Sequence, residues 1–116
     1  MFHTQSLTPN TLFRRAYYRG TKAYCRFFTV YYRKNGLSNN RLGFTVSVKI
    51  GNAVVRNRIR RRLKEAYRLS EDKLINGYDI VIVARDASLN TEFAQLIKSI
   101  TRLLDKSVTE TKMLPK

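Results

Sequence analysis

The sequence predicts an α+β fold in which helices cover a single β-sheet. Three observations carry this prediction: segments with the apolar period of helices, one segment that alternates like a strand, and one short, wholly apolar run. Their order along the chain is helix, hairpin, helix, strand, helix. We expect one domain over residues 1–116, ordered over about 8–106, because no linker-like composition divides the chain.

The first half of the chain predicts a helix and two strands. Thr8-Pro9 is typical of a helix start, and Gly20 is typical of a helix end. Aromatic and β-branched residues dominate from Cys25 to Arg33, which favours a strand. The segment from Arg41 to Lys49 alternates between apolar and polar residues, as a strand with one core face does. Turn-forming residues separate these two strands, so we expect an antiparallel hairpin.

The second half predicts a helix, a strand and a further helix. Asn52 is a candidate N-cap for a helix from about Val54 to Leu69, where apolar residues recur at helical spacing. The strand expected from Tyr78 to Ala84 contains four consecutive β-branched residues, which indicates burial on both faces. A second apolar stripe predicts the last helix from Thr91 to about Lys106.

The positive charge is concentrated in the first half of the chain. The 23 Lys and Arg residues outnumber 8 Asp and Glu residues, which gives a net charge of +15. No acidic residue precedes Glu65, so residues 1–64 carry 15 basic residues, whereas residues 65–116 carry eight of each sign. This asymmetry predicts a surface that binds a polyanion, foremost a nucleic acid.

The most informative segment is the predicted helix after Asn52. With Lys49 to its N-terminal side, it belongs to a run of twenty residues that holds eight basic residues and one acid. Its apolar positions form one stripe, so the basic residues gather on the remaining surface. Guanidinium groups suit phosphate oxygens because they can donate two parallel hydrogen bonds. The candidate phosphate-binding residues are Arg56, Asn57, Arg58, Arg60, Arg61, Lys64 and Arg68.

Aromatic residues indicate a second candidate surface. Phe13 and Tyr17 are four residues apart on the first helix, and Phe27 and Tyr31 are expected on one side of a strand. Together with Thr45, they could form a shallow cleft on which unpaired bases stack. Aromatic residues at such spacings are equally often core residues, so both interpretations stand.

Residues typical of catalysis are scarce. His3 is the only histidine, and no Cys/His spacing or glycine-rich loop indicates a metal or phosphate site. Cys25 is the only cysteine and no apolar run is long enough for a membrane span, so we expect a cytoplasmic protein with no membrane partner. A self-contained nuclease is not predicted.

Residues 49–64, with the sequence KIGNAVVRNRIRRRLK, resemble the signature of the bacterial ribonuclease P protein family. The resemblance extends over about residues 8–106 and includes GFTVS at 43–47 and DIVIVAR at 79–85. One departure is Tyr17, where the family often has Phe. The resemblance implies a single-domain αβββαβα sandwich, ribosomal-protein-like, with a very short third strand near Lys49 to Asn52 and a left-handed βαβ crossover.

The same resemblance implies the function. The protein subunit of ribonuclease P assists a catalytic RNA, which removes the 5′ leader of precursor tRNA by Mg²⁺-dependent hydrolysis. The RNA would hold the Mg²⁺, and this chain would supply no catalytic residue and need no nucleotide cofactor. The basic helix residues named above would bind the catalytic RNA. The residues implied for the leader are Phe13, Tyr17, Phe27, Tyr31, Thr45, Ser47 and Lys49.

Three other classes remain open on the residues alone. A ribosomal protein would explain the charge and the fold, but not the Arg-Asn-Arg signature. A DNA-binding module would explain the basic helix and leave the aromatic cleft without a role. A membrane-surface protein would need exposed apolar residues on the basic helix, whose apolar stripe is instead expected in the core.

Overall fold

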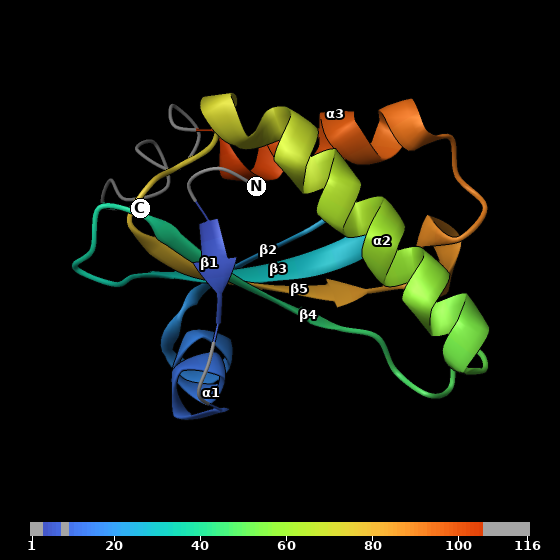
Figure 1. Ribbon diagram of the computed structural model, residues 1–116, viewed down its shortest axis with the longest axis horizontal. Coiled ribbons are helices and arrows are strands. Elements are labelled where there is room, and N and C mark those ends of the chain that lie inside the picture. Colours follow the sequence, from blue (N-terminus) through green and yellow to red (C-terminus); the bar gives the residue numbers. More distant parts are fainter. Residues whose placement is uncertain (1–3, 8–9, 106–116) are drawn as a thin grey trace.

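The computed structural model describes residues 4–7 and 10–105, without the side chains of residues 10–13 and 17. In this part of the chain, five strands form one mixed sheet, and three α-helices pack against it (Figure 1). The strands are β1 (Thr4–Ser6), β2 (Thr21–Tyr24), β3 (Phe28–Lys34), β4 (Asn40–Thr45) and β5 (Tyr78–Ala84). The helices are α1 (Asn10–Arg19), α2 (Ala53–Ser70) and α3 (Phe93–Leu104), with short 3-10 turns at Glu71–Lys73 and Asp86–Ser88.

The strand order is β1-β4-β5-β3-β2, so β5 lies in the middle of the sheet. It runs antiparallel to β3 and parallel to β4. The predicted hairpin of β3 and β4 is therefore wrong, because β5 lies between them. The apolar β5 is buried along almost its whole length and gains a neighbour on each side.

The hairpin that does form joins β2 to β3, with Thr21 opposite Tyr32 and Tyr24 opposite Thr29. The predicted first strand from Cys25 therefore spans a bend as well as β3. The predicted strand near residues 49–52 is also wrong. That segment is a turn, in which the Ile50 amide donates to the Ser47 carbonyl at 3.1 Å. The αβββαβα order still holds through β2, β3 and β4, and β1 is an additional edge strand.

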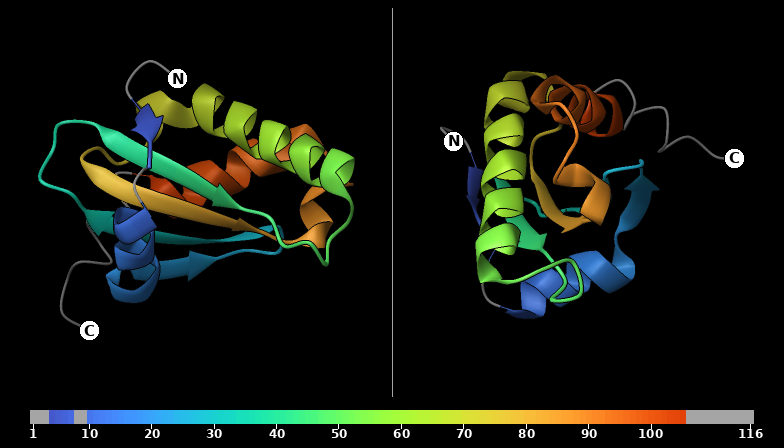
Figure 2. Two further views of the ribbon diagram at one scale, coloured as in Figure 1. Left: turned by 60° about the horizontal axis from the view of Figure 1, so that its bottom comes forward. Right: turned by 90° about the vertical axis from the view of Figure 1, so that its right-hand side faces the viewer.

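Helix α2 forms the crossover between the parallel strands β4 and β5. Seen from the α2 side with β4 running upward, β5 lies to the left, so the crossover is left-handed, as the resemblance implies (Figures 1 and 2). Helices α2 and α3 cover this face of the sheet, and α1 packs on the opposite face (Figure 2).

The larger core lies between the sheet and helices α2 and α3. Its wholly buried residues include Phe28 of β3, Ile80 of β5 and Leu63 of α2. A smaller cluster beneath α1 joins Leu7, Ala16 and Val81.

Gly20 ends α1 at a point where only glycine fits. An added Cβ would lie 2.3 Å from the Ala16 carbonyl oxygen and 2.8 Å from that of Tyr32. The first of these atoms belongs to α1 and the second to β3, so the missing side chain lets the helix end against the sheet.

Asn40 joins three elements at the buried end of β4. Its Nδ2 donates to the Tyr67 hydroxyl at 3.0 Å and to the Ile75 carbonyl at 2.7 Å, and its Oδ1 accepts from the Tyr78 amide at 2.9 Å. Tyr67 also contacts the Thr4 hydroxyl at 2.9 Å, which ties β1 to α2. Burial raises the pKa of Tyr67, so its hydroxyl keeps its proton.

We expect Asn40→Ala to lower the free energy of unfolding by about 3 kcal/mol, because it leaves buried backbone groups without partners. The neighbouring Asn39→Ala should change it by less than about 0.5 kcal/mol. Urea unfolding of both variants measures this, and equal midpoints would contradict the role of Asn40.

Candidate nucleic-acid interface

The basic helix α2 begins at a capped end. The Asn52 side chain accepts a hydrogen bond from the Val55 amide at 3.0 Å, which confirms the predicted N-cap. The predicted stripe is buried at Ile59, Leu63 and Ala66. Because this stripe faces the core, the opposite side of the helix faces solvent.

That opposite side carries an exposed set of residues that we call the basic face: Asn57, Arg58, Arg60, Arg61 and Lys64. Arg60 is oriented by a hydrogen bond of 3.0 Å to the Asn57 Oδ1 atom. Within the described part of the chain, no carboxylate forms an ion pair with the four cations. No carboxylate that the structure describes therefore neutralises their positive charge.

The other arginines of α2 have different surroundings. The Arg68 Nε lies 3.0 and 3.1 Å from the two Glu65 carboxylate oxygens, and these hydrogen bonds lower the pKa of Glu65. Glu65 thus offsets the charge of Arg68. Arg62 donates to the Thr91 carbonyl just before α3, and Arg56 is partly buried. Helical spacing places Arg56 and Arg62 on the flanks of the helix, but it does not separate Arg68 from the basic face.

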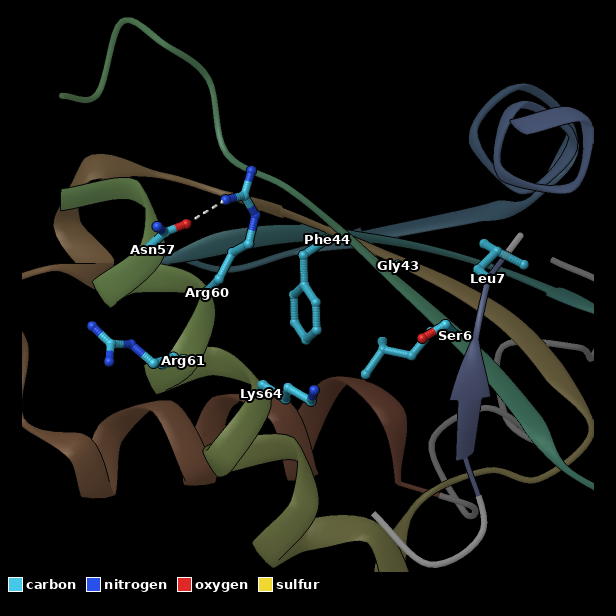
Figure 3. Close-up of a pocket in the computed structure, with 9 residues that line it drawn as sticks. Ser6, Leu7, Gly43, Phe44, Asn57, Arg60, Arg61 and Lys64 are labelled. Atoms are coloured by element: carbon cyan, nitrogen blue, oxygen red, sulfur yellow. Dashed lines mark hydrogen bonds between the residues drawn. The ribbon is translucent and has the colours of Figure 1, made fainter. Parts of the chain in front are cut away.

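A groove of about 700 Å³ runs between α2 and the sheet edge formed by β1 and β4 (Figure 3). Arg60, Arg61 and Lys64 line its helix side, and the ring of Phe44 projects into it from β4 (Figure 3). The remaining lining residues are Ser6, Leu7, Leu42, Gly43 and Asn57. Sequence reasoning missed the β1 wall because a strand of three residues leaves no periodic signal.

The predicted cleft lies on the other face of the sheet, beside α1. Thr29 of β3 pairs with Val83 of β5, which pairs with Thr45 of β4. Tyr31 occupies the adjacent row opposite Val81, so Thr29, Tyr31 and Thr45 share one face, as predicted. Ser47 and Lys49 are exposed in the turn after β4.

The remaining aromatic residues of the predicted cleft differ in their placement. Phe13 and Tyr17 belong to α1, which packs on this face, but their side chains lie outside the described residues. Phe27 lies in a bend before β3, packs partly against the larger core and lines a hollow with Gln95 of α3. Strand alternation placed Phe27 beside Tyr31, and this grouping is wrong because the strand starts one residue later.

Comparison with known proteins identifies the family. The chain matches the family model for ribonuclease P over residues 1–108. The chain belongs to the ribonuclease P protein family. It is 46% identical over 95 residues to the ribonuclease P protein component of Caldanaerobacter subterraneus subsp. tengcongensis, covering 82% of each chain. It is 40% identical over 105 residues to that of Clostridioides difficile, covering 90% and 92%.

Solved structures of this family have the same fold. The ribonuclease P protein of Thermotoga maritima superimposes with a TM-score of 0.78 at 28% identity, covering 86% of this chain and 94% of its own. That of Staphylococcus aureus gives a TM-score of 0.74 at 29% identity, covering 95% and 97%. The mixed α+β fold is therefore that of the family.

The carboxylates that the structure describes do not form a metal-binding cluster. Within residues 4–7 and 10–105, no three His, Cys, Asp or Glu side chains are grouped so that they could hold a metal ion. Asp79, at the start of β5, accepts two hydrogen bonds from the Arg41 guanidinium at 2.7 and 2.9 Å. None of the helices in this part of the chain combines the length and the apolar character needed to cross a membrane.

Arg61 and Arg62 are adjacent in sequence and differ in role, which a stability measurement can test. We expect Arg62→Ala to lower the free energy of unfolding by about 1 kcal/mol, because its contact with the Thr91 carbonyl and its packed stem are lost. Arg61→Ala should stay within about 0.5 kcal/mol of the unchanged protein. Thermal unfolding compares the two, and a larger loss for Arg61→Ala would contradict this division.

Proposed function

We propose that the basic face of α2 binds the RNA subunit of ribonuclease P, and that the sheet face beside α1 binds the single-stranded 5′ leader of precursor tRNA. As a member of its family, the chain is the protein component of ribonuclease P, the endoribonuclease that processes the 5′ end of tRNA. The observation that carries the proposal is the set of exposed cations on α2 that pair with none of the carboxylates in the described part of the chain.

Electrostatics favours a polyanion at this face. Like charges on neighbouring turns of one helix repel each other and lower its stability. Phosphate groups would remove this repulsion, and each phosphate contact would also release counterions. The groove beside the basic face adds the Phe44 ring, on which an unpaired base could stack. The family signature Arg56-Asn57-Arg58 lies at the first turns of this helix.

The leader assignment is supported by the alternation of β4. Phe44 lines the groove, while its neighbour Thr45 lies on the opposite face with Thr29 and Tyr31. The RNA subunit in the groove and the leader in the cleft would therefore lie on opposite sides of β4. This arrangement would hold the substrate close to the RNA subunit. The floor of the cleft would suit an extended single strand of RNA.

Mg²⁺ would be held by the RNA subunit and would support the hydrolysis. The protein would contribute positive charge between these two RNAs. Cations of the basic face would lower the repulsion between the RNA subunit and the precursor tRNA, so less Mg²⁺ would be needed to bring them together.

The experiment is cleavage of a precursor tRNA by a bacterial ribonuclease P RNA at low Mg²⁺, with and without this protein. We expect no cleavage by the protein alone and restored cleavage by the pair. The double variant Arg61→Ala/Lys64→Ala should bind the RNA at least about tenfold more weakly, because hydrogen bonds to charged groups contribute about 1.5 kcal/mol or more each. Its slope of log affinity against log salt should fall by about two.

The matched control is Lys98→Ala/Arg102→Ala, which removes two exposed cations from α3. This control should leave the RNA affinity and the salt slope nearly unchanged. Equal losses for the two double variants would show that only net charge matters, and would contradict a specific role for α2. Tight RNA binding that never promotes cleavage would overturn the proposed function.

A further inference from the structure

We propose that the leader surface continues beyond the cleft onto β2, where Tyr24 and Arg85 form a platform that stacks a further base of single-stranded RNA. This inference rests on the proposed leader function and extends it to residues at the far edge of the sheet. Neither residue belongs to the basic face, to the groove beside it or to the leader set that the family resemblance implies.

Strand register connects Tyr24 to the cleft. Tyr24 is the last residue of β2 and lies opposite Thr29 of β3. Thr29 pairs with Val83, and Val83 pairs with Thr45. Paired residues in neighbouring strands share a face, so one continuous row crosses the sheet from Tyr24 to Thr45. Thr29 in this row is buried and hydrogen-bonded to Arg85, so a strand of RNA bound at Thr45 could reach the β2 edge by passing over the Arg85 side chain.

The Tyr24 ring is exposed and held in place by a cation. Tyr24 is 66% exposed, which is unusual for an aromatic residue in a sheet. The Arg85 guanidinium lies 6.0 Å from the ring centroid, and its Nη2 lies 3.3 Å from the Thr29 hydroxyl. Arg85 therefore places a positive charge beside the ring, within reach of the phosphate of a nucleotide stacked there.

The adjacent row repeats this combination. Lys22 of β2 lies opposite Tyr31, and its Nζ is 6.0 Å from the Tyr31 ring centroid. Tyr24 and Tyr31 are diagonal neighbours on adjacent strands, which places them about 7–8 Å apart, a step similar to that between nucleotides in extended RNA. Two tyrosine–cation pairs at this spacing suit two successive nucleotides. A ring exposed at the edge of a sheet, as Tyr24 is, can stack an unpaired base, so the partner would be single-stranded.

One acid lies on the same face, in the row beyond Tyr31. Asp79 pairs there with Arg33 on one side and with Arg41 on the other. Arg41 forms an ion pair with its carboxylate at 2.7 Å, so the negative charge is offset within the sheet. This face as a whole therefore has a net positive charge, which favours a chain of phosphates.

The test uses the holoenzyme reconstituted with a bacterial ribonuclease P RNA, and two precursor tRNAs, one with a long leader and one with a single-nucleotide leader. We expect Tyr24→Ala to weaken binding of the long-leader substrate about tenfold, the effect of losing one stacked base. Binding of the single-nucleotide substrate should be unchanged. Tyr24→Trp should retain binding, because it retains a stacking ring, and Arg85→Gln should lower the salt slope for the long leader by about one.

Tyr18→Ala is the matched control, because Tyr18 is a 77% exposed tyrosine on α1 outside both rows. Thr45→Glu serves as the reference for the cleft itself. If the unchanged protein does not distinguish the two leaders, the proposed leader function fails and the platform with it. If Thr45→Glu abolishes the distinction while Tyr24→Ala behaves like Tyr18→Ala, the leader function stands and the platform is overturned.

Discussion

The insertion of β5 between β3 and β4 determines the rest of this structure. Strand β5 is apolar on both faces, so it is stable only in the middle of a sheet with helices on both sides. Because it runs parallel to β4, the chain must cross the sheet between these strands, and α2 makes that crossing. The crossing places the apolar stripe of α2 on the core and leaves its basic face in solvent.

The same insertion separates the two surfaces that are proposed to bind RNA. On the α2 side, the groove meets the edge formed by β1 and β4, and on the α1 side the row of Thr29, Val83 and Thr45 crosses β3, β5 and β4. Acidic residues are absent from the first half of the chain, so the few carboxylates come from later elements. Asp79 offsets Arg41 and Glu65 offsets Arg68, while no carboxylate among residues 4–7 and 10–105 pairs with the basic face. The unneutralised charge therefore lies where the RNA subunit is proposed to bind.

Local patterns predicted the elements better than their pairing. The boundaries of α2, α3 and β5 follow from apolar periodicity and from the Asn52 cap, and the structure confirms them within two residues. The pairing of β3 was predicted wrongly, because periodicity shows which face of a strand is buried and not which strand lies beside it. The left-handed crossover came from the family resemblance, since general rules favour the opposite hand.

The candidate sites show the same limit. Helical spacing located the basic face, but it could not show that Glu65 offsets Arg68 or that Arg62 contacts the segment before α3. Strand alternation placed Tyr31 and Thr45 on one face and failed at Phe27, because the strand does not extend to that residue. Tyr24 and Arg85 meet only through the register of β2 with β3 and the side-chain contacts in the folded sheet.

The central claim is that two faces of one sheet serve two different RNAs, and site-directed crosslinking tests it most directly. In a Cys25→Ala background, a photoreactive probe would be attached at Lys64→Cys in the groove or at Ser47→Cys after β4, with Arg102→Cys on α3 as control. We expect the probe at position 64 to crosslink to the RNA subunit and the probe at position 47 to the precursor tRNA leader. Crosslinks from position 64 to the leader, or none to the RNA subunit, would contradict this account.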